Sequence, residues 1–192
     1  MITCDKIETV KKNSNVFETP FIRVDVDEVR FPDGKSGEYS IIHQGDGAGA
    51  VAIPFYTYRG IGYIGLTRQY RYPLGSELFE FPRGGTSDFE QEEATREVEE
   101  EMGFTPTSML SIGDFHPDSG VLSMKIRTWV AFANIRSVPE EHIEEETGLR
   151  ALWVSESTFE GMILTGKITC GVTLAAYALF RSKRATFGHV IA

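Results

Sequence analysis

Cysteine is scarce in this chain, which has only Cys4 and Cys170 among its 192 residues. Two cysteines cannot build a disulfide framework or a zinc ligand set, so both kinds of site are excluded. Long apolar runs are also missing, because no stretch approaches the roughly 18 residues of a membrane span. The segment MITCDKIETVKK lacks the apolar centre of a secretion signal. We therefore expect a cytoplasmic protein that does not contact a membrane.

Positive charge is in short supply as well. Lysine and arginine number 19 against 28 aspartates and glutamates, which leaves a formal net charge of −9. This balance excludes a broad nucleic-acid surface, which would need clustered basic residues. A phosphate ligand remains open, because metal ions can bridge acidic residues to phosphate. Hydrophobic residues make up 41% of the chain, enough for a domain of this length to bury a core.

The first part of the chain predicts strands rather than helices. The first twenty residues are polar, and we expect them to be irregular or loosely attached. From Ile22 onward apolar and charged residues alternate, which predicts a half-buried strand. A turn at Pro32-Asp33-Gly34 and a returning strand over residues 39–44 follow. We therefore divide the chain into a strand-rich extension, residues 1–45, and a main domain, residues 46–192.

Strand and helix patterns alternate in a mixed order along the main domain. We expect strands over residues 51–55, 61–67, 78–81, 108–114, 126–133 and 149–154. We expect helices over residues 88–102, 158–165 and 172–183. This order predicts an α/β sandwich around a mixed sheet.

The glycine-rich segment GDGAGA, residues 45–50, matches the spacing of a dinucleotide-binding loop. That motif needs a following helix whose N-terminus faces the phosphate. Here the following residues are β-branched and strand-like, so we interpret the segment as a turn between strands.

A strongly acidic segment carries most of the functional information. Seven glutamates lie between residues 90 and 101, in a stretch with helical periodicity. Ser87 and Glu90 have the spacing of a capping box at the helix start, and Gly103 is a natural stop.

The helical positions of these glutamates separate them into two groups. Ala94, Val98 and Met102 form one stripe that should face the core. Glu97 and Glu101 lie on the edge of that stripe, whereas Glu92 and Glu99 point to the solvent side. An acidic solvated helix explains the second group well but not the first, because carboxylates four residues apart repel and rarely lie unpaired beside a core. A hard cation with oxygen ligands would relieve both costs.

Four segments resemble a known family. REVEEEMGF, residues 96–104, looks like the second half of the Nudix box, and EFPRGG, residues 80–85, resembles the strand that enters it. RQYRYP, residues 68–73, and GKIT, residues 166–169, are similar to segments of the family's ADP-ribose pyrophosphatases. The resemblance spans roughly residues 20–185. It implies a Nudix-type α/β/α sandwich around a mixed sheet, with an N-terminal β-strand extension.

The loop before the acidic helix departs from the family pattern. From Gly84 to Arg96 the chain has 11 intervening residues where the pattern has 13, and Asp88 stands in a glutamate position. This puts the geometry of the carbonyl near Gly84 and the exact substrate in doubt, while the helix half of the motif is complete.

The resemblance implies metal-dependent hydrolysis of a nucleoside diphosphate sugar, with ADP-ribose giving AMP and ribose 5-phosphate. It assigns Mg²⁺ or Mn²⁺ to Glu97, Glu100, Glu101 and the backbone carbonyl of Arg83 or Gly84. Arg96 would orient Glu100.

A late acidic segment, residues 139–147, would supply a further catalytic glutamate. Alignment of the strand that follows favours Glu145, with Glu144 and Glu146 as alternatives. The resemblance implies substrate contacts for Arg68, Arg71 and Glu80, since arginine offers planar donors to phosphate. A solvated loop and exposed strand ends remain the structural alternatives for these residues.

Relatives of this type commonly form homodimers through their N-terminal strands, so we expect a homodimer. Three other functions stay open. The substrate could be GDP-mannose or another sugar nucleotide, or the chain could be a nucleotide sensor with the same fold and no catalysis. Isoprenoid diphosphate isomerisation needs a catalytic cysteine in the pocket, and neither Cys4 nor Cys170 has a promising position in the sequence.

Overall fold

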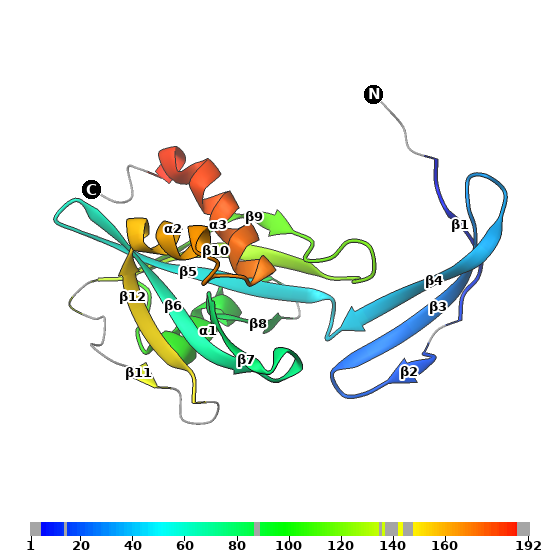
Figure 1. Ribbon diagram of the computed structural model, residues 1–192, viewed down its shortest axis with the longest axis horizontal. Helices are drawn as coiled ribbons and strands as arrows, with labels where there is room; N and C mark the ends of the chain where they lie inside the picture. Colours follow the sequence, from blue (N-terminus) through cyan, green and yellow to red (C-terminus); the bar gives the residue numbers. More distant parts are fainter. Residues whose placement is uncertain are drawn as a thin grey trace.

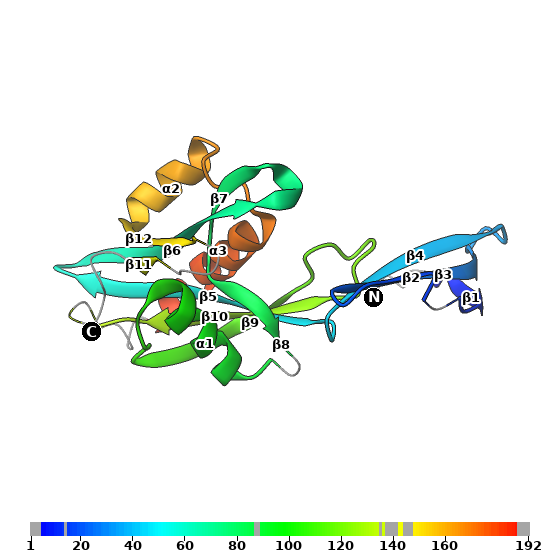
Figure 2. The same ribbon diagram turned by 90° about the horizontal axis from the view of Figure 1, so that it is seen from below.

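The computed structural model describes residues 5–13, 15–86, 89–134, 136, 142–143 and 148–187. Within these residues the chain forms a small N-terminal sheet and a larger mixed sheet that is covered by helices (Figure 1). Both views show the small sheet extending away from the helix-covered body (Figure 2). None of the described helices is long and apolar enough to cross a membrane.

The N-terminal sheet contains the two strands that the alternating pattern predicts. Its strands are β1 (Glu8–Lys11), β2 (Phe17–Glu18), β3 (Ile22–Arg30) and β4 (Ser36–Gln44). β3 and β4 pair antiparallel around a turn at Gly34, whose φ is +84°. The expectation that the first twenty residues are irregular is wrong, because β1 and β2 both pair with β3. These strands are held by backbone pairing and have exposed side chains, so they leave no alternating pattern in the sequence.

The larger sheet confirms the α/β prediction. Its strands are β5 (Ala48–Tyr58), β6 (Ile61–Arg71), β7 (Ser76–Glu80), β8 (Arg83–Thr86), β9 (Ser108–Phe115), β10 (Lys125–Phe132), β11 (His142–Ile143) and β12 (Arg150–Ser155). The order is β11-β12-β6-β5-β10-β9, with β7 beside β6 and β8 beside β5. β10 runs parallel to β5 and the other pairs are antiparallel, so the sheet is mixed.

Helices cover both faces of this sheet and make the sandwich. They are α1 (Gln91–Met102), α2 (Glu156–Leu164) and α3 (Gly171–Lys183), with short 3-10 turns η1 (Tyr72–Leu74) and η3 (Arg184–Phe187). Strand β5 shows how the faces are divided, because its residues alternate. Val51 and Ile53 belong to the core under α2 and α3, whereas Ala50 and Ala52 belong to the core under α1. Small alanines allow α1 to approach the sheet closely.

Helix α1 buries the stripe that its spacing predicts. Ala94, Val98 and Met102 are almost fully buried. Burial of side chains the size of Val98 and Met102 contributes roughly 1.5–3 kcal/mol each. The helix ends at Gly103, whose φ is +71° and whose N–H donates to the carbonyl of Glu99. This termination is the one expected from the sequence.

The start of α1 differs from the sequence prediction. The helix begins at Gln91, not near residue 88, and Glu90 itself is the capping residue, so the capping box is wrong. The reason is the left-handed backbone of Phe89, whose φ is +62° and which interrupts the helix. The Phe89 ring is held by two cations: Lys125 Nζ lies 4.6 Å and Arg127 Cζ 5.1 Å from its centroid. Residues 87 and 88 lie outside the described residues.

A glycine-rich turn joins the two sheets. Gly45 and Gly47 have φ values of +50° and +78°, which confirms a turn between strands over residues 45–47, while residues 48–50 already belong to β5. The sheets are also linked at Ile42, whose N–H donates to Val121 and whose carbonyl accepts from Ser123, both at 2.9 Å. The division into residues 1–45 and 46–192 stays a prediction, although the turn lies at that boundary.

Candidate functional site

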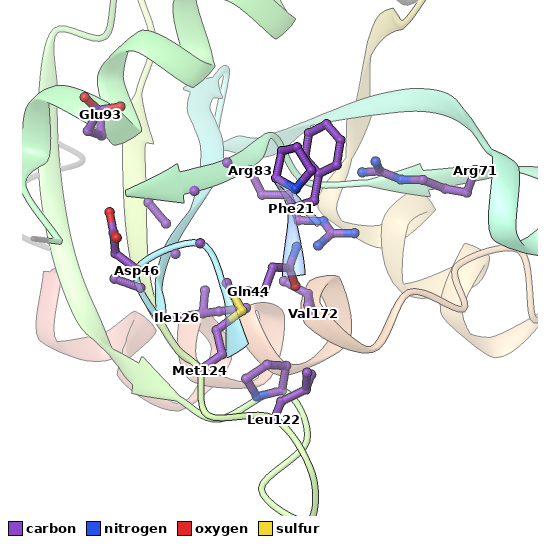
Figure 3. A pocket seen from close by; sticks show the side chains of 18 residues that line it. Phe21, Gln44, Asp46, Arg71, Arg83, Glu93, Leu122, Met124, Ile126 and Val172 are labelled. Carbon is purple, nitrogen blue, oxygen red and sulfur yellow. The ribbon is translucent and has the colours of Figure 1, made fainter. Parts of the chain in front are cut away.

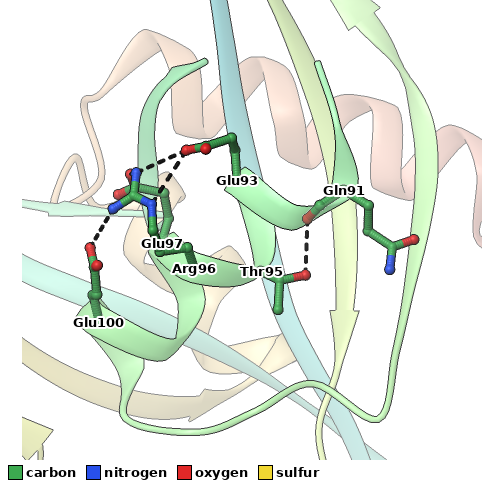
Figure 4. A network of polar contacts seen from close by, with 6 residues as sticks. All are labelled: Gln91, Glu93, Thr95, Arg96, Glu97 and Glu100. Carbon is green, nitrogen blue, oxygen red and sulfur yellow. Dashed lines mark hydrogen bonds and ion pairs between the residues drawn. The ribbon is translucent and has the colours of Figure 1, made fainter. Parts of the chain in front are cut away.

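Arg96 gathers three carboxylates on the exposed side of α1. Its Nη2 lies 2.6 Å from Glu97 Oε1 and 3.1 Å from Glu93 Oε2, and its Nη1 lies 2.7 Å from Glu100 Oε2 (Figure 4). Arg96 and Glu100 are four residues apart, so they are neighbours on the helix surface. The guanidinium therefore fixes the direction of carboxylates that would otherwise repel one another.

The glutamates of α1 differ in burial as the helical wheel predicts. Glu92 and Glu99 are exposed. The Glu97 side chain is only 13% exposed, compared with 53% for Glu100. Burial raises the pKa of Glu97, although Arg96 opposes the shift. Burial and then the neighbouring charge of Glu97 raise the pKa of Glu101 to about 8.

Gly84 provides the close approach that this acidic face needs. It lies on β8, opposite Ala50 of β5, and so faces the α1 side of the sheet. A Cβ atom at Gly84 would overlap the carboxylate of Glu97. Only glycine leaves room there for the Glu97 carboxylate, and the structure therefore brings together two residues that the sequence assigns to one site.

The donors on this face fit a divalent cation. Glu97 and Glu101 offer carboxylate oxygens, which hard cations prefer, and the raised pKa of each shows that its negative charge is poorly compensated. In the described part of the chain, no three acidic, histidine or cysteine side chains converge on one point. Arg96 engages Glu97 and Glu100 instead. A cation at this face would supply the compensation that Glu101 lacks.

A second polar cluster surrounds the buried carboxylate of Glu80. Arg71 Nε donates to Glu80 Oε2 at 2.6 Å, and Arg83 Nη2 donates to Oε1 at 3.4 Å. Burial opposes ionisation of Glu80, but Arg83 and Arg71 together hold its pKa below the usual value. The thiol of Cys170, at the start of α3, also contacts this carboxylate.

Arg68 is not part of this cluster. It forms an ion pair with Glu77 of β7, and about half of its side chain is exposed. It also does not line either of the two clefts described below. Of the two arginines singled out in RQYRYP, only Arg71 therefore reaches Glu80 and the clefts.

Two adjoining clefts open beside these clusters. The main cleft, of about 710 Å³, is lined by Phe21, Gln44, Asp46, Arg71, Arg83 and Glu93, among others. The side cleft, of about 410 Å³, is lined by Pro73, Leu78, Glu80 and Cys170, and it shares Arg71 and Arg83 with the main cleft. Figure 3 shows Arg71 and Arg83 in one part of the main cleft and Asp46 and Glu93 in another. The cleft thus has a cationic region and an acidic region.

Several cleft residues do not stand out in the sequence. Phe21 is 79% exposed in the turn between β2 and β3, and Gln44 and Asp46 lie at the turn that joins the sheets. An aromatic residue next to Pro20 in a polar stretch is a weak signal for a binding surface. The arginine within FPRGG is a stronger signal for an anion-binding surface.

The late acidic segment is only partly described. Glu145, Glu144 and Glu146 lie outside the described residues, so the catalytic assignment there stays a prediction. The described neighbour His142 contacts the end of α1, where its Nε2 lies 2.7 Å from the carbonyl oxygen of Glu100. The chain therefore passes beside the acidic helix three residues before Glu145.

The raised pKa of Glu101 predicts a pH dependence of cation binding. Below pH 8 this carboxyl holds a proton that a cation must displace, so affinity should rise about tenfold per pH unit up to about pH 8 and then level off. Calorimetric titration of Mn²⁺ between pH 6 and pH 9 measures this slope. A flat affinity over that range would contradict it.

The same shift predicts how stability depends on pH without metal. The folded pKa of Glu101 lies above its ordinary value of 4.5, so the folded state holds a proton that the unfolded state releases. The resulting contribution is complete below pH 4.5 and is lost as the pH rises to about 8. Urea unfolding in EDTA measures the free energy of unfolding at each pH. As the pH rises from 4.5 to about 8, this free energy should fall less for Glu101→Gln than for the wild type.

Comparison with known proteins gives two related sequences and a similar structure. The ADP-ribose pyrophosphatase of Bacillus subtilis (strain 168) is 30% identical over 126 residues, which cover 65% of this chain and 65% of that protein. The methanol dehydrogenase activator of Bacillus methanolicus is 29% identical over 126 residues, with the same two coverages. The chain thus spans 65% of the length of each of these relatives. No family model matches the sequence.

A crystal structure of an ADP compounds hydrolase has the same fold. It matches 98% of this chain and 99% of its own length with a TM-score of 0.79, although only 17% of the aligned residues are identical. The match includes the N-terminal sheet as well as the sandwich, since so little of either chain is left out. The predicted fold class is confirmed.

Proposed function

We propose that the chain is a member of the Nudix family and that it hydrolyses the diphosphate linkage of a nucleoside diphosphate sugar with the help of a divalent cation. The preferred substrate is ADP-ribose, which would give AMP and ribose 5-phosphate. One observation carries this proposal: the Glu97 carboxylate packs against Gly84, and Gly84 lines a cleft whose other region contains Arg71 and Arg83. Such a cleft offers charge of both signs to a diphosphate and its counter-cation.

The acidic face would hold the cation, Mg²⁺ or Mn²⁺. The proposed ligands are the carboxylates of Glu97, Glu100 and Glu101 and the backbone carbonyl of Gly84. A bound cation neutralises phosphate charge and makes a coordinated water more acidic. Arg96 keeps Glu100 in position through its 2.7 Å contact.

We assign the base that activates water to Glu145. The contact of His142 with the carbonyl of Glu100 supports this choice, because it brings the segment before Glu145 to the end of α1. Glu144 and Glu146 are the alternatives. Arg71 and Glu80 would contact the substrate from the opposite region, and a substrate role for Arg68 remains a prediction without support from its position.

A homodimer through the N-terminal sheet is part of the proposal. Val10, Val16 and Phe17 of this sheet are each more than half exposed, which is costly for apolar side chains in water. A second copy of the sheet would cover them. Light scattering of the purified protein measures the mass, and a monomer at micromolar concentration would contradict the dimer. The cytoplasmic location also stays a prediction.

Substrate preference is tested by initial rates with Mg²⁺ on ADP-ribose, GDP-mannose and other sugar nucleotides. We expect the highest kcat/KM for ADP-ribose, with AMP as the nucleotide product. A preference for GDP-mannose would keep the chemistry and change the substrate. Tight binding without cleavage of any of them would favour a nucleotide sensor instead.

A further inference from the structure

Two arginines share one carboxylate at the boundary between the clefts. Arg71 and Arg83 both contact Glu80, which is 1% exposed and whose pKa is held below the usual value. Two guanidinium groups facing one ionised carboxylate leave an excess of one positive charge. The Nε of Arg83 is buried and has no hydrogen-bond partner among the described residues, although a guanidinium has five N–H donors to satisfy.

The pleat of β8 determines which way Arg83 faces. Gly84 pairs with Ala50, on the α1 side of the sheet, and Arg83 pairs with Val51, whose side chain lies on the α2 and α3 side. The Arg83 side chain therefore points away from the Glu97 carboxylate. The next residue of the strand, Gly84, packs against that carboxylate. The pleat thus turns the Arg83 side chain away from Glu97, although the charges of Arg71 and Arg83 still act on Glu101 and partly offset the rise in its pKa that burial causes.

We propose that Arg83 is a substrate-binding residue that, together with Arg71, holds the diphosphate of the substrate across Glu80. This inference rests on the proposed function, and it adds Arg83 to the substrate contacts expected from the sequence. Arg83 has an unused Nε–H donor, and the planar arrangement of guanidinium donors suits phosphate oxygens. Glu80 keeps both arginines in position but cannot neutralise both.

The position of the pair also limits the kind of substrate. Arg71 and Arg83 line both the main cleft and the side cleft, so an anion between them has space on each side. A diphosphate substituted at both ends fits this arrangement. A nucleoside triphosphate, whose last phosphate has no substituent, would leave the second cleft unfilled.

Binding of ADP-ribose in EDTA tests this inference without any turnover. Isothermal titration should show Arg83→Gln binding ADP-ribose about tenfold to a hundredfold more weakly than the wild type. Arg59→Gln, which removes an exposed arginine in the turn between β5 and β6, outside both clefts, should bind within about twofold of the wild type. Thermal unfolding of each variant checks that the fold is intact.

Arg83→Lys keeps the test decisive if the glutamine variant does not fold. Lysine retains the charge beside Glu80 but loses the planar set of donors, so its binding should also be weaker. Wild-type affinity in a folded Arg83→Gln or Arg83→Lys protein would overturn the proposal, as would a wild type that does not bind ADP-ribose. Weakened binding in a protein that hydrolyses no sugar nucleotide would support Arg83 while rejecting the proposed hydrolysis.

Discussion

Replacement of Glu101 with glutamine is expected to lower the rate of AMP release from ADP-ribose by at least about a hundredfold, while the protein stays folded. Mutation of residues that only support the ligands of a metal site already lowers metal affinity or activity by about 10–100-fold. Glu101 is a proposed direct ligand, so its replacement should lower activity at least as much. Glutamine keeps the size of the side chain but removes its charge. Because burial disfavours the charged form of Glu101, the metal-free variant should be at least as stable as the wild type above pH 8.

The control for this variant lies on the same helix. Glu99 is exposed on the opposite side of α1, so Glu99→Gln removes the same charge from the same helix without reaching the site. Its rate should stay within about twofold of the wild type. If the rates of Glu99→Gln and Glu101→Gln fall by the same factor, the net charge of the helix determines the rate, and the assignment of Glu101 as a ligand is wrong.

Alanine at Gly84 is expected to have the second large effect, a loss of activity of about a hundredfold with little loss of stability. Its methyl group would displace the Glu97 carboxylate, which is the far end of a flexible side chain and can move at low cost to the fold. The displaced carboxylate would no longer face Gly84. The rates should be measured at saturating Mg²⁺ alongside the unfolding free energy.

The neighbouring glycine offers a matched comparison. A Cβ atom at Gly85 would meet no other atom within 4 Å, so Gly85→Ala adds the same methyl group one residue later, on the other face of β8. Its activity should be much closer to that of the wild type. Equal activities of the two alanine variants would show that the contact between Gly84 and Glu97 has no catalytic importance.

The helix and its acidic face could be predicted from the sequence because their signals are local. The spacing of Ala94, Val98 and Met102 determines which face is buried, and the same geometry places Glu97 and Glu101 at its edge. The strands of the sandwich follow from runs of apolar residues in the same way. Long, periodic segments contain this information within ten to twenty residues.

Other features depend on contacts between distant segments. The pairing of Arg71 with Arg83 around Glu80 arises because β6 and β7 lie side by side and β8 follows directly. The resemblance of RQYRYP implies substrate contacts for both Arg68 and Arg71, yet β7 provides Glu77 as a separate partner for Arg68. Strands β1 and β2 likewise form only because β3 presents its edge to them.

The departure at Phe89 has a cause that lies outside the local sequence. A non-glycine residue with positive φ is uncommon, and the capping pattern of Ser87 and Glu90 points to a different start of the helix. The two cations above the Phe89 ring come from β10, far along the chain. Tertiary contacts therefore override the local capping signal here.

The central claim is hydrolysis of a diphosphate that depends on a divalent cation, and one measurement tests it most directly. The purified wild type is incubated with ADP-ribose in Mg²⁺, in EDTA, and in EDTA followed by excess Mg²⁺, and AMP and ribose 5-phosphate are quantified. We expect equal amounts of both products with Mg²⁺, none in EDTA, and recovery when Mg²⁺ is restored. Product formation that is unaffected by EDTA, or an intact substrate under all three conditions, would contradict the account.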